Sequence, residues 1–121
     1  MMGDLGKKLV DGLLADLRNL SAEAKKKYPV VRQAAEGSVL KIRTISAKEE
    51  DTAAAISEAN LEVLQPLVLG CDSRCPKLVQ ISLTSIQRLV SHRAVSESGA
   101  EQIVAVLWGL MEAGMEELKV L

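Results

Sequence analysis

The sequence predicts an all-α domain, a HEAT or armadillo-like α-solenoid of about six helices, from three observations. Apolar residues recur at helical spacing along most of the 121-residue chain. There is no Phe, and only one Trp and one Tyr, so the core must be aliphatic, which suits packed helices better than sheets. The segment 76–92 is apolar on two sides, as expected of an inner helix.

This inner helix is the centre of the predicted fold. We expect a short helix that ends at Gly70, then a tight turn, and then a helix that begins at Pro76, where the missing N–H of proline costs nothing. One face of the second helix carries Val79, Leu83, Ile86 and Val90, and the other side carries Leu78, Ile81 and Leu89. A helix, a tight turn and a doubly buried helix form the repeating unit of an α-solenoid.

Further helices are predicted before this unit. An amphipathic helix of about 16 residues begins near residue 5, and Ser21 is a candidate N-cap for one more turn. The next helix begins at Pro29 and leaves Leu40 pointing away from its stripe. That stripe is predicted to be Val31, Ala34, Ala35, Ser38, Ile42 and Ile45. A short, weakly packed helix follows around Ile56, and Asn60 is the predicted cap of the helix after it.

The last predicted helix opens at Ser96 or Ser98, and Ser98 has capping-box spacing to Glu101. It runs to Leu121 without a stop signal, so we expect the natural chain to continue. Its predicted buried stripe is Ala100, Ile103, Val104, Leu107, Leu110, Met111 and Leu118.

A partner-binding site is predicted at the flank of this last stripe. Trp108 and Met115 lie about 100° and about 80° round the helix from the centre of the stripe. Trp is enriched among interface hot spots, so we expect an apolar strip beside the groove between the last two helices, with Arg88 and His92 at its rim. The alternative is that Trp108 packs under a neighbouring helix.

Charge gives a second candidate surface. The formal net charge is −1, so no global positive field attracts nucleic acid. Residues 1–48 hold ten Lys and Arg against five Asp and Glu, whereas 49–121 hold five against eleven. The cluster Lys25, Lys26 and Lys27 is therefore an alternative membrane-surface site, although a solvated face is the simpler explanation of these charges. Targeting signals and long apolar runs are missing from the sequence, so we expect a cytosolic protein.

Catalytic and metal-binding patterns are weak. Cys71 and Cys75 are four residues apart, but a structural zinc site needs four ligands and His92 is the only further candidate. His92 also lacks the nucleophile and orienting acid of a catalytic triad, and the glycines are too isolated for a phosphate loop. We predict a protein-interaction domain with no enzymatic activity, metal or cofactor.

Several stretches carry a resemblance to a known family. They are LQPLVLGC at 64–71, PK at 76–77, IQRLVSH at 86–92 and LWGLME at 107–112. They resemble the N-terminal dimerisation and cyclophilin-binding (DCB) domain of the large Arf guanine-nucleotide exchange factors, in particular of the Mon family (Mon-two, monensin sensitivity). Matching stretches at 17–18, 25–31 and 41–45 extend the resemblance over nearly the whole chain.

The resemblance implies a single DCB-type helical-repeat domain over residues 1–121, at the N-terminus of a longer chain. Mon-type proteins are large scaffolds, peripheral on Golgi, trans-Golgi network and endosome membranes. They act in endosome-to-Golgi traffic with Dopey-type partners and an aminophospholipid flippase, and they lack the catalytic exchange domain. In relatives, this domain self-associates, contacts the following helical domain and in some cases binds an activated Arf-like small GTPase.

Overall fold

The computed structural model describes residues 2–48 and 50–120, with side chains described for 6–48 and 50–118. Within these residues there are six α-helices and one short 3-10 helix, and no β-strand. The elements are α1 (Met2–Ala24), α2 (Pro29–Lys48), α3 (Thr52–Glu58), α4 (Asn60–Asp72), α5 (Pro76–Ser91), α6 (Glu97–Glu112) and η1 (Glu116–Val120). The predicted all-α, solenoid-like fold is confirmed.

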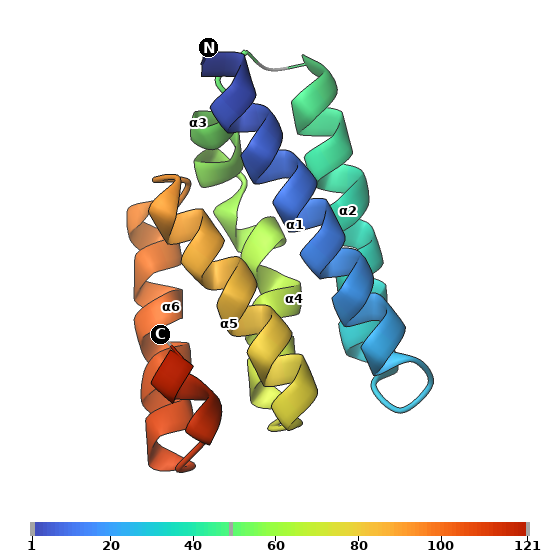
Figure 1. Cartoon of the computed structure of the whole chain (residues 1–121), viewed down its shortest axis with the longest axis vertical. Helices are drawn as coiled ribbons and strands as arrows, with labels where there is room; N and C mark the ends of the chain where they lie inside the picture. The colour runs from blue at the N-terminus through green and yellow to red at the C-terminus, as the bar shows by residue number, and fades with distance from the viewer. Residues whose placement is uncertain (1, 49, 121) are drawn as a thin grey trace.

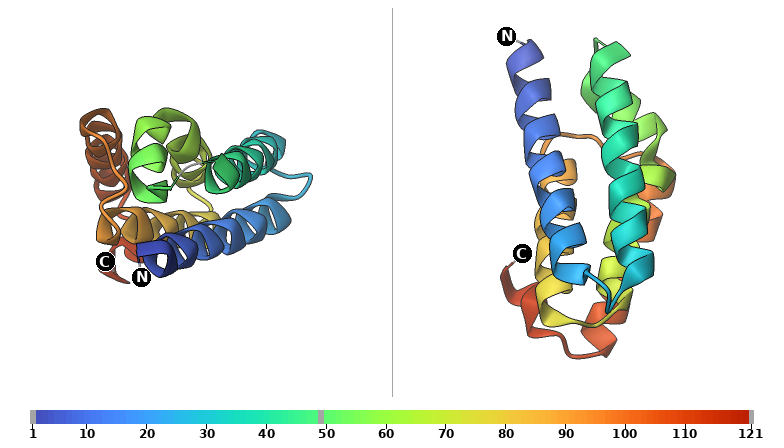
Figure 2. Two further views of the ribbon diagram at one scale, coloured as in Figure 1. Left: turned by 90° about the horizontal axis from the view of Figure 1, so that it is seen from above. Right: turned by 90° about the vertical axis from the view of Figure 1, so that its right-hand side faces the viewer.

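The helices form two layers (Figures 1 and 2). α1 and α5 lie side by side in one layer, and α2, α4 and α6 form the other, with the short α3 at one end of α4. The long helices alternate in direction, so the α1–α2 turn, the α4–α5 turn and the end of α6 share one end of the molecule. α4 is the middle helix of its layer, because it packs against α2, α5 and α6.

The core lies between these layers and is aliphatic. Its large side chains with less than 2% exposure are Leu9, Leu13, Leu17, Leu20, Ile42, Ile56, Leu64, Leu67, Leu78, Leu83, Leu89 and Leu110. Every α-helix contributes at least one of them. The whole described chain is therefore organised around one core, with α5 covered by α1 on one side and α4 on another.

The predicted helix starts agree well with the structure where a proline or an acceptor side chain marks them. α2 begins at Pro29 and α5 at Pro76. Ser96 is the N-cap of α6, and its hydroxyl oxygen accepts a hydrogen bond from the Gly99 N–H at 3.0 Å. The alternative capping box at Ser98 is wrong, because Ser98 already lies inside the first turn of α6.

Two predicted boundaries in the middle of the chain are also wrong. α1 continues through Ser21, whose hydroxyl donates a 3.4 Å hydrogen bond to Glu36 of α2 instead of capping a new turn. α4 continues through Gly70 to Asp72. Gly70 is buried, and a Cβ there would collide with the hydroxyl oxygen of Ser82 on α5. This glycine therefore permits close approach of two helices and does not end one.

The end of α6 differs from the prediction as well. Gly114 has φ +67°, and its N–H donates to the Met111 carbonyl at 3.0 Å, while the Met115 N–H donates to the Leu110 carbonyl at 3.1 Å. This pair of bonds is a Schellman motif, so α6 does have a stop signal. The chain then folds back as η1, which packs against α5 and α6.

α5 ends with the same motif, built on a different residue. Arg93 has φ +55°, and its N–H donates to the Val90 carbonyl at 3.1 Å. The Ala94 N–H donates to the Leu89 carbonyl at 2.9 Å. Val90, predicted to be buried, lies in this last turn and is 54% exposed, so that part of the predicted inner face is wrong.

Candidate protein-interaction site

The outward face of α6 carries an exposed apolar stripe. Val104, Trp108 and Met111, together called the α6 stripe below, are 59%, 57% and 58% exposed. Their spacing of four and three residues places them on one side of the helix. The predicted burial of Val104 and Met111 is therefore wrong.

The buried face of α6 is rotated from the predicted one. The residues that it buries are Gly99, Ile103, Val106 and Leu110. This face packs on α4, and Leu107 is only half-buried at its edge. The α6 stripe therefore lies on the other side of Leu107, and Trp108 is not a core residue.

A buried asparagine fixes this rotation. Asn60 is 1% exposed, and its amide nitrogen donates to the carbonyls of Ile56 at 3.0 Å and Ala94 at 2.9 Å. Its amide oxygen accepts from the Ser96 N–H at 2.8 Å and from the Ser96 hydroxyl at 3.3 Å. Gly99 lies against it, since a Cβ at Gly99 would collide with the Asn60 amide. Asn60 thus attaches the start of α6 to α4.

Asn60 is not the N-cap predicted from the sequence. The cap position of α4 is Ala59, which makes no side-chain hydrogen bond there. The sequence did carry a signal for the buried position of Asn60. At helical spacing, Asn60 falls on the same face as Val63, Leu64 and Leu67, which are buried. A polar residue in such a stripe indicates a buried hydrogen-bonding group.

Arg88 lies between α5 and α1, away from the α6 stripe. Its Nε donates to Asp16 Oδ2 at 3.0 Å, with the side chains 33% and 13% exposed. The guanidinium lies over Gly12 of α1, where a Cβ would collide with it. This ion pair and the glycine beneath it position α5 on α1, so Arg88 has a structural partner already.

The four predicted contact residues do not form one site. A Cβ on Gly109 would lie 3.1 Å from Arg74 Nη2, which places the Trp108 end of α6 beside the α4–α5 turn. Arg88 lies at the other end of α5, about 18 Å from its start at 1.5 Å per residue. His92 is further still, as the C-cap residue of α5. Met115 shares the Trp108 end of the domain but is half-buried against the core.

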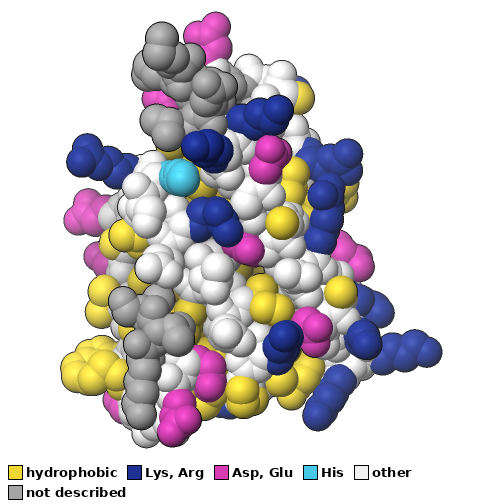
Figure 3. Space-filling view, viewed as in Figure 1, with side chains coloured by type: hydrophobic (Ala, Val, Ile, Leu, Met, Phe, Trp, Pro, Cys, Tyr) yellow, Lys and Arg dark blue, Asp and Glu magenta, His cyan; other side chains and the backbone are white. Residues whose placement is uncertain are grey.

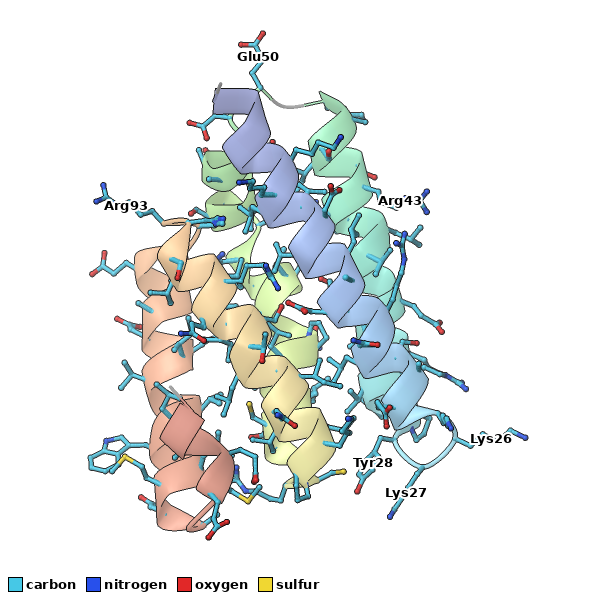
Figure 4. The ribbon with its side chains drawn as sticks, viewed as in Figure 1. Lys26, Lys27, Tyr28, Arg43, Glu50 and Arg93 are labelled. Atoms are coloured by element: carbon cyan, nitrogen blue, oxygen red, sulfur yellow. The ribbon has the colours of Figure 1, made fainter. Side chains whose placement is uncertain are left out.

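The lysine cluster occupies the tip of the α1–α2 turn. Lys25, Lys26 and Lys27 are all exposed, and Figure 4 shows Lys26 and Lys27 projecting away from the helices. Lys27 Nζ lies 5.7 Å from the ring centroid of Tyr28, within cation–π range. In the view of Figure 3, basic side chains gather on the α1–α2 side of the molecule. All three lysines are therefore accessible to solvent, and Lys26 and Lys27 project from the tip of the turn.

The cysteines have the properties of packing residues. Burial, followed by the nearby charge of Asp72, raises the pKa of the Cys71 thiol to about 12, so Cys71 stays a neutral thiol at physiological pH. Cys75 is half-buried, and both thiols are free. Among the described residues, no three His, Cys, Asp or Glu side chains are grouped closely enough to hold a metal ion. None of the helices in this part of the chain is long and apolar enough to cross a membrane.

Comparison with known proteins places this geometry in a family. Residues 4–121 match the sequence model of DCB, described as the Mon2/Sec7/BIG1-like dimerisation and cyclophilin-binding domain. The chain is 48% identical over 115 residues to "Protein MON2 homolog" of Homo sapiens, covering 95% of this chain and 7% of that protein. It is 51% identical over 118 residues to "Monensin-resistant homolog 2" of Caenorhabditis elegans, with the same coverage of 95% and 7%.

The similarity extends to more distant relatives. "Protein MON2" of Saccharomyces cerevisiae is 28% identical over 110 residues, which cover 90% of this chain and 6% of that protein. The chain thus spans less than a tenth of the length of these curated relatives. No solved structure matches it. Together with the all-α fold, the match over residues 4–121 establishes that the chain belongs to the Mon2/Sec7/BIG1-like DCB family.

Proposed function

We propose that this chain is a non-catalytic protein–protein interaction domain of a large scaffold in endosome-to-Golgi vesicle traffic. The observation that carries the proposal is the α6 stripe, because contiguous apolar surface edged by polar groups is typical of protein interfaces. Its flanking residues Glu101 and Glu112 are exposed and charged. The scaffold would be cytoplasmic and peripheral on Golgi, trans-Golgi network and endosome membranes.

The partner that we propose for the α6 stripe is a further pair of helices from the same full-length protein. α6 is the outermost helix of its layer, so its far side has the position that the next repeat of a solenoid would fill (Figure 1). The curated relatives are more than ten times longer than the matched region, which supports a longer full-length protein. Self-association and binding of an Arf-like small GTPase are further expected activities of the domain. Contacts with a Dopey-type scaffold and an aminophospholipid flippase would be made through the full-length protein.

Substitution of Trp108 tests this proposal. Trp108→Ala should weaken binding of the 121-residue chain to the remainder of the scaffold, supplied as a separate chain, by about 2 kcal/mol or roughly 30-fold in Kd. Isothermal titration calorimetry measures this loss. The urea midpoint should change little, because Trp108 is 57% exposed.

Leu61→Ala is the matched control, since Leu61 is 58% exposed on α4 and lies outside the α6 stripe. It should leave the affinity unchanged. Equal binding by the wild type and Trp108→Ala would contradict the proposal. A stability loss of about 3–5 kcal/mol with unchanged binding would instead make Trp108 a core residue.

A membrane-surface role is the second candidate, and the projecting lysines of the α1–α2 turn favour it. Clustered Lys side chains near an anionic leaflet contribute about 1 kcal/mol each, screened by salt. Co-sedimentation with phosphatidylserine vesicles should then be lost in a variant with Lys25, Lys26 and Lys27 all changed to Glu. No binding by the wild type at low salt would exclude this role.

A further inference from the structure

We propose that the outer groove between α1 and α2 is a self-association surface, and that its occupant is the same groove of a second copy related by a two-fold axis. This inference rests on the proposed interaction role and assigns self-association to a specific surface, at the opposite edge of the domain from the α6 stripe. The groove has a volume of about 390 Å³. Its lining residues are Leu17, Arg18, Ser21, Ala22, Glu36, Val39 and Leu40.

The groove lies on the side of the domain that no other described helix covers. Gly12 and Asp16 mark the side of α1 that meets α5, through their contacts with Arg88. Arg18 and Ser21 lie on the opposite side of α1 by helical spacing. The right-hand view of Figure 2 looks onto α1 and α2 from this uncovered side. A second protein can therefore reach the groove without displacing a helix.

The groove supplies both a knob and a hole. Leu40 stands at its edge with 65% of its surface exposed, more than any other large apolar side chain described. Ala22 and the half-buried Val39 lie beside it and leave the concavity between the helices open. A two-fold interface needs one patch that is complementary to itself. Insertion of Leu40 of each copy into the groove of the other meets that requirement.

The charges of the groove are also self-complementary. Arg18 comes from the α1 wall and Glu36 from the α2 wall. Arg18 forms no salt bridge with any residue whose side chain is described, and Glu36 accepts only the 3.4 Å hydrogen bond from Ser21. A two-fold axis that runs along the groove would set the α1 wall of each copy against the α2 wall of the other, and so Arg18 against Glu36. Two ion pairs would then flank the inserted leucines and fix the orientation.

A heterodimer experiment tests this arrangement. Sedimentation velocity of the wild-type chain over a concentration series gives its dimer dissociation constant. Arg18→Glu places two carboxylates opposite each other in the dimer, and Glu36→Arg places two guanidinium groups opposite each other. Each variant alone should therefore dimerise at least about tenfold more weakly. An equimolar mixture should recover dimers with close to wild-type affinity, because every pair across the mixed interface is again of opposite charge.

Controls make each outcome decisive. Lys77→Glu, an exposed charge reversal at the start of α5, should leave dimerisation unchanged. Leu40→Asp should abolish it while the thermal midpoint stays near that of the wild type, since Leu40 is exposed. Emission from Trp108, the only tryptophan in the chain, should be the same in monomer and dimer, because the α6 stripe stays outside the interface.

Three results would overturn the inference. The first is a wild-type chain that remains monomeric throughout the concentration series. The second is a dimer that tolerates both charge reversals, or whose variants are not rescued by mixing. The third is a dimer that forms with a blue shift of Trp108 emission and is lost in Trp108→Ala, which would place self-association on the α6 stripe. The first two results leave the proposed role of the α6 stripe unaffected, because calorimetry with the separate scaffold chain tests that role.

Discussion

α5 and α6 are both 16 residues long, yet they are used differently. α5 buries seven residues between α1 and α4, whereas α6 buries four, mainly against α4. α6 is nevertheless the more apolar helix, with nine Ala, Val, Ile, Leu, Met or Trp residues against seven in α5. Burial in this domain is therefore set by the position of a helix in the two layers. The excess of apolar residues on α6 lies on its exposed side, as the α6 stripe.

The largest expected loss of stability follows from a substitution in α5, the inner helix. Leu83 is 0% exposed, so Leu83→Ala should lower the free energy of unfolding by about 2–5 kcal/mol, through lost burial and the cavity left behind. Urea denaturation followed by circular dichroism measures this change. Val90→Ala on the same helix should cost less than about 0.5 kcal/mol, because Val90 is 54% exposed. Similar losses for the two variants would show that α5 is not an inner helix.

A smaller effect is expected where α4 meets α5. Gly70→Ala should destabilise the domain by about 1–3 kcal/mol, because the new methyl group collides with the Ser82 hydroxyl and forces the helices apart. In a Ser82→Ala background the same change should be neutral or stabilising by up to about 1 kcal/mol, since Ala is the better helix former. The double-mutant cycle is measured by thermal unfolding. Equal costs in both backgrounds would mean that contact with Ser82 does not limit the approach.

The smallest expected change in stability concerns the residues that end α5 and α6. Both end in a Schellman motif, but the left-handed position is Arg93 in α5 and Gly114 in α6. Arg93→Gly should stabilise the domain by about 1 kcal/mol, and Gly114→Ala should destabilise it by a similar amount, because side chains with a Cβ are strained at positive φ. Thermal midpoints that move in opposite directions would agree with this view. A loss of stability in Arg93→Gly would mean that the arginine side chain contributes more than its strain costs.

The fold was predictable from the sequence because its strongest signals are local. Pro29 and Pro76 each begin a helix, since proline is favoured at the first helical position, where its missing N–H would have no partner within the helix. Gly70 was misread because a glycine near the end of an apolar run has two uses, as a C-cap or as a place where helices approach closely. Only the position of Ser82 on a neighbouring helix decides between them.

The site was harder to predict than the fold. The apolar arc of α6 is wider than one contact, so periodicity alone could not say which half faces α4 and which half remains exposed. That choice is made by Asn60 and Gly99, which lie 39 residues apart in the sequence. The sequence also predicted Arg88 at the rim of the α6 site, and the structure places it elsewhere for a similar reason. Arg88 is paired with Asp16 of α1, a partner that no local pattern in α5 could identify.

The amide of Asn60 has a consequence for how the domain opens. It is hydrogen-bonded at once to the end of α3, to the α5–α6 loop and to the N-cap residue of α6. If α6 moves away from α4, this buried amide loses its hydrogen bonds to Ala94 and Ser96, and water cannot quickly replace them. Backbone hydrogens at Ser96 and in the first turn of α6 should therefore exchange with solvent at a common rate, as one cooperative unit.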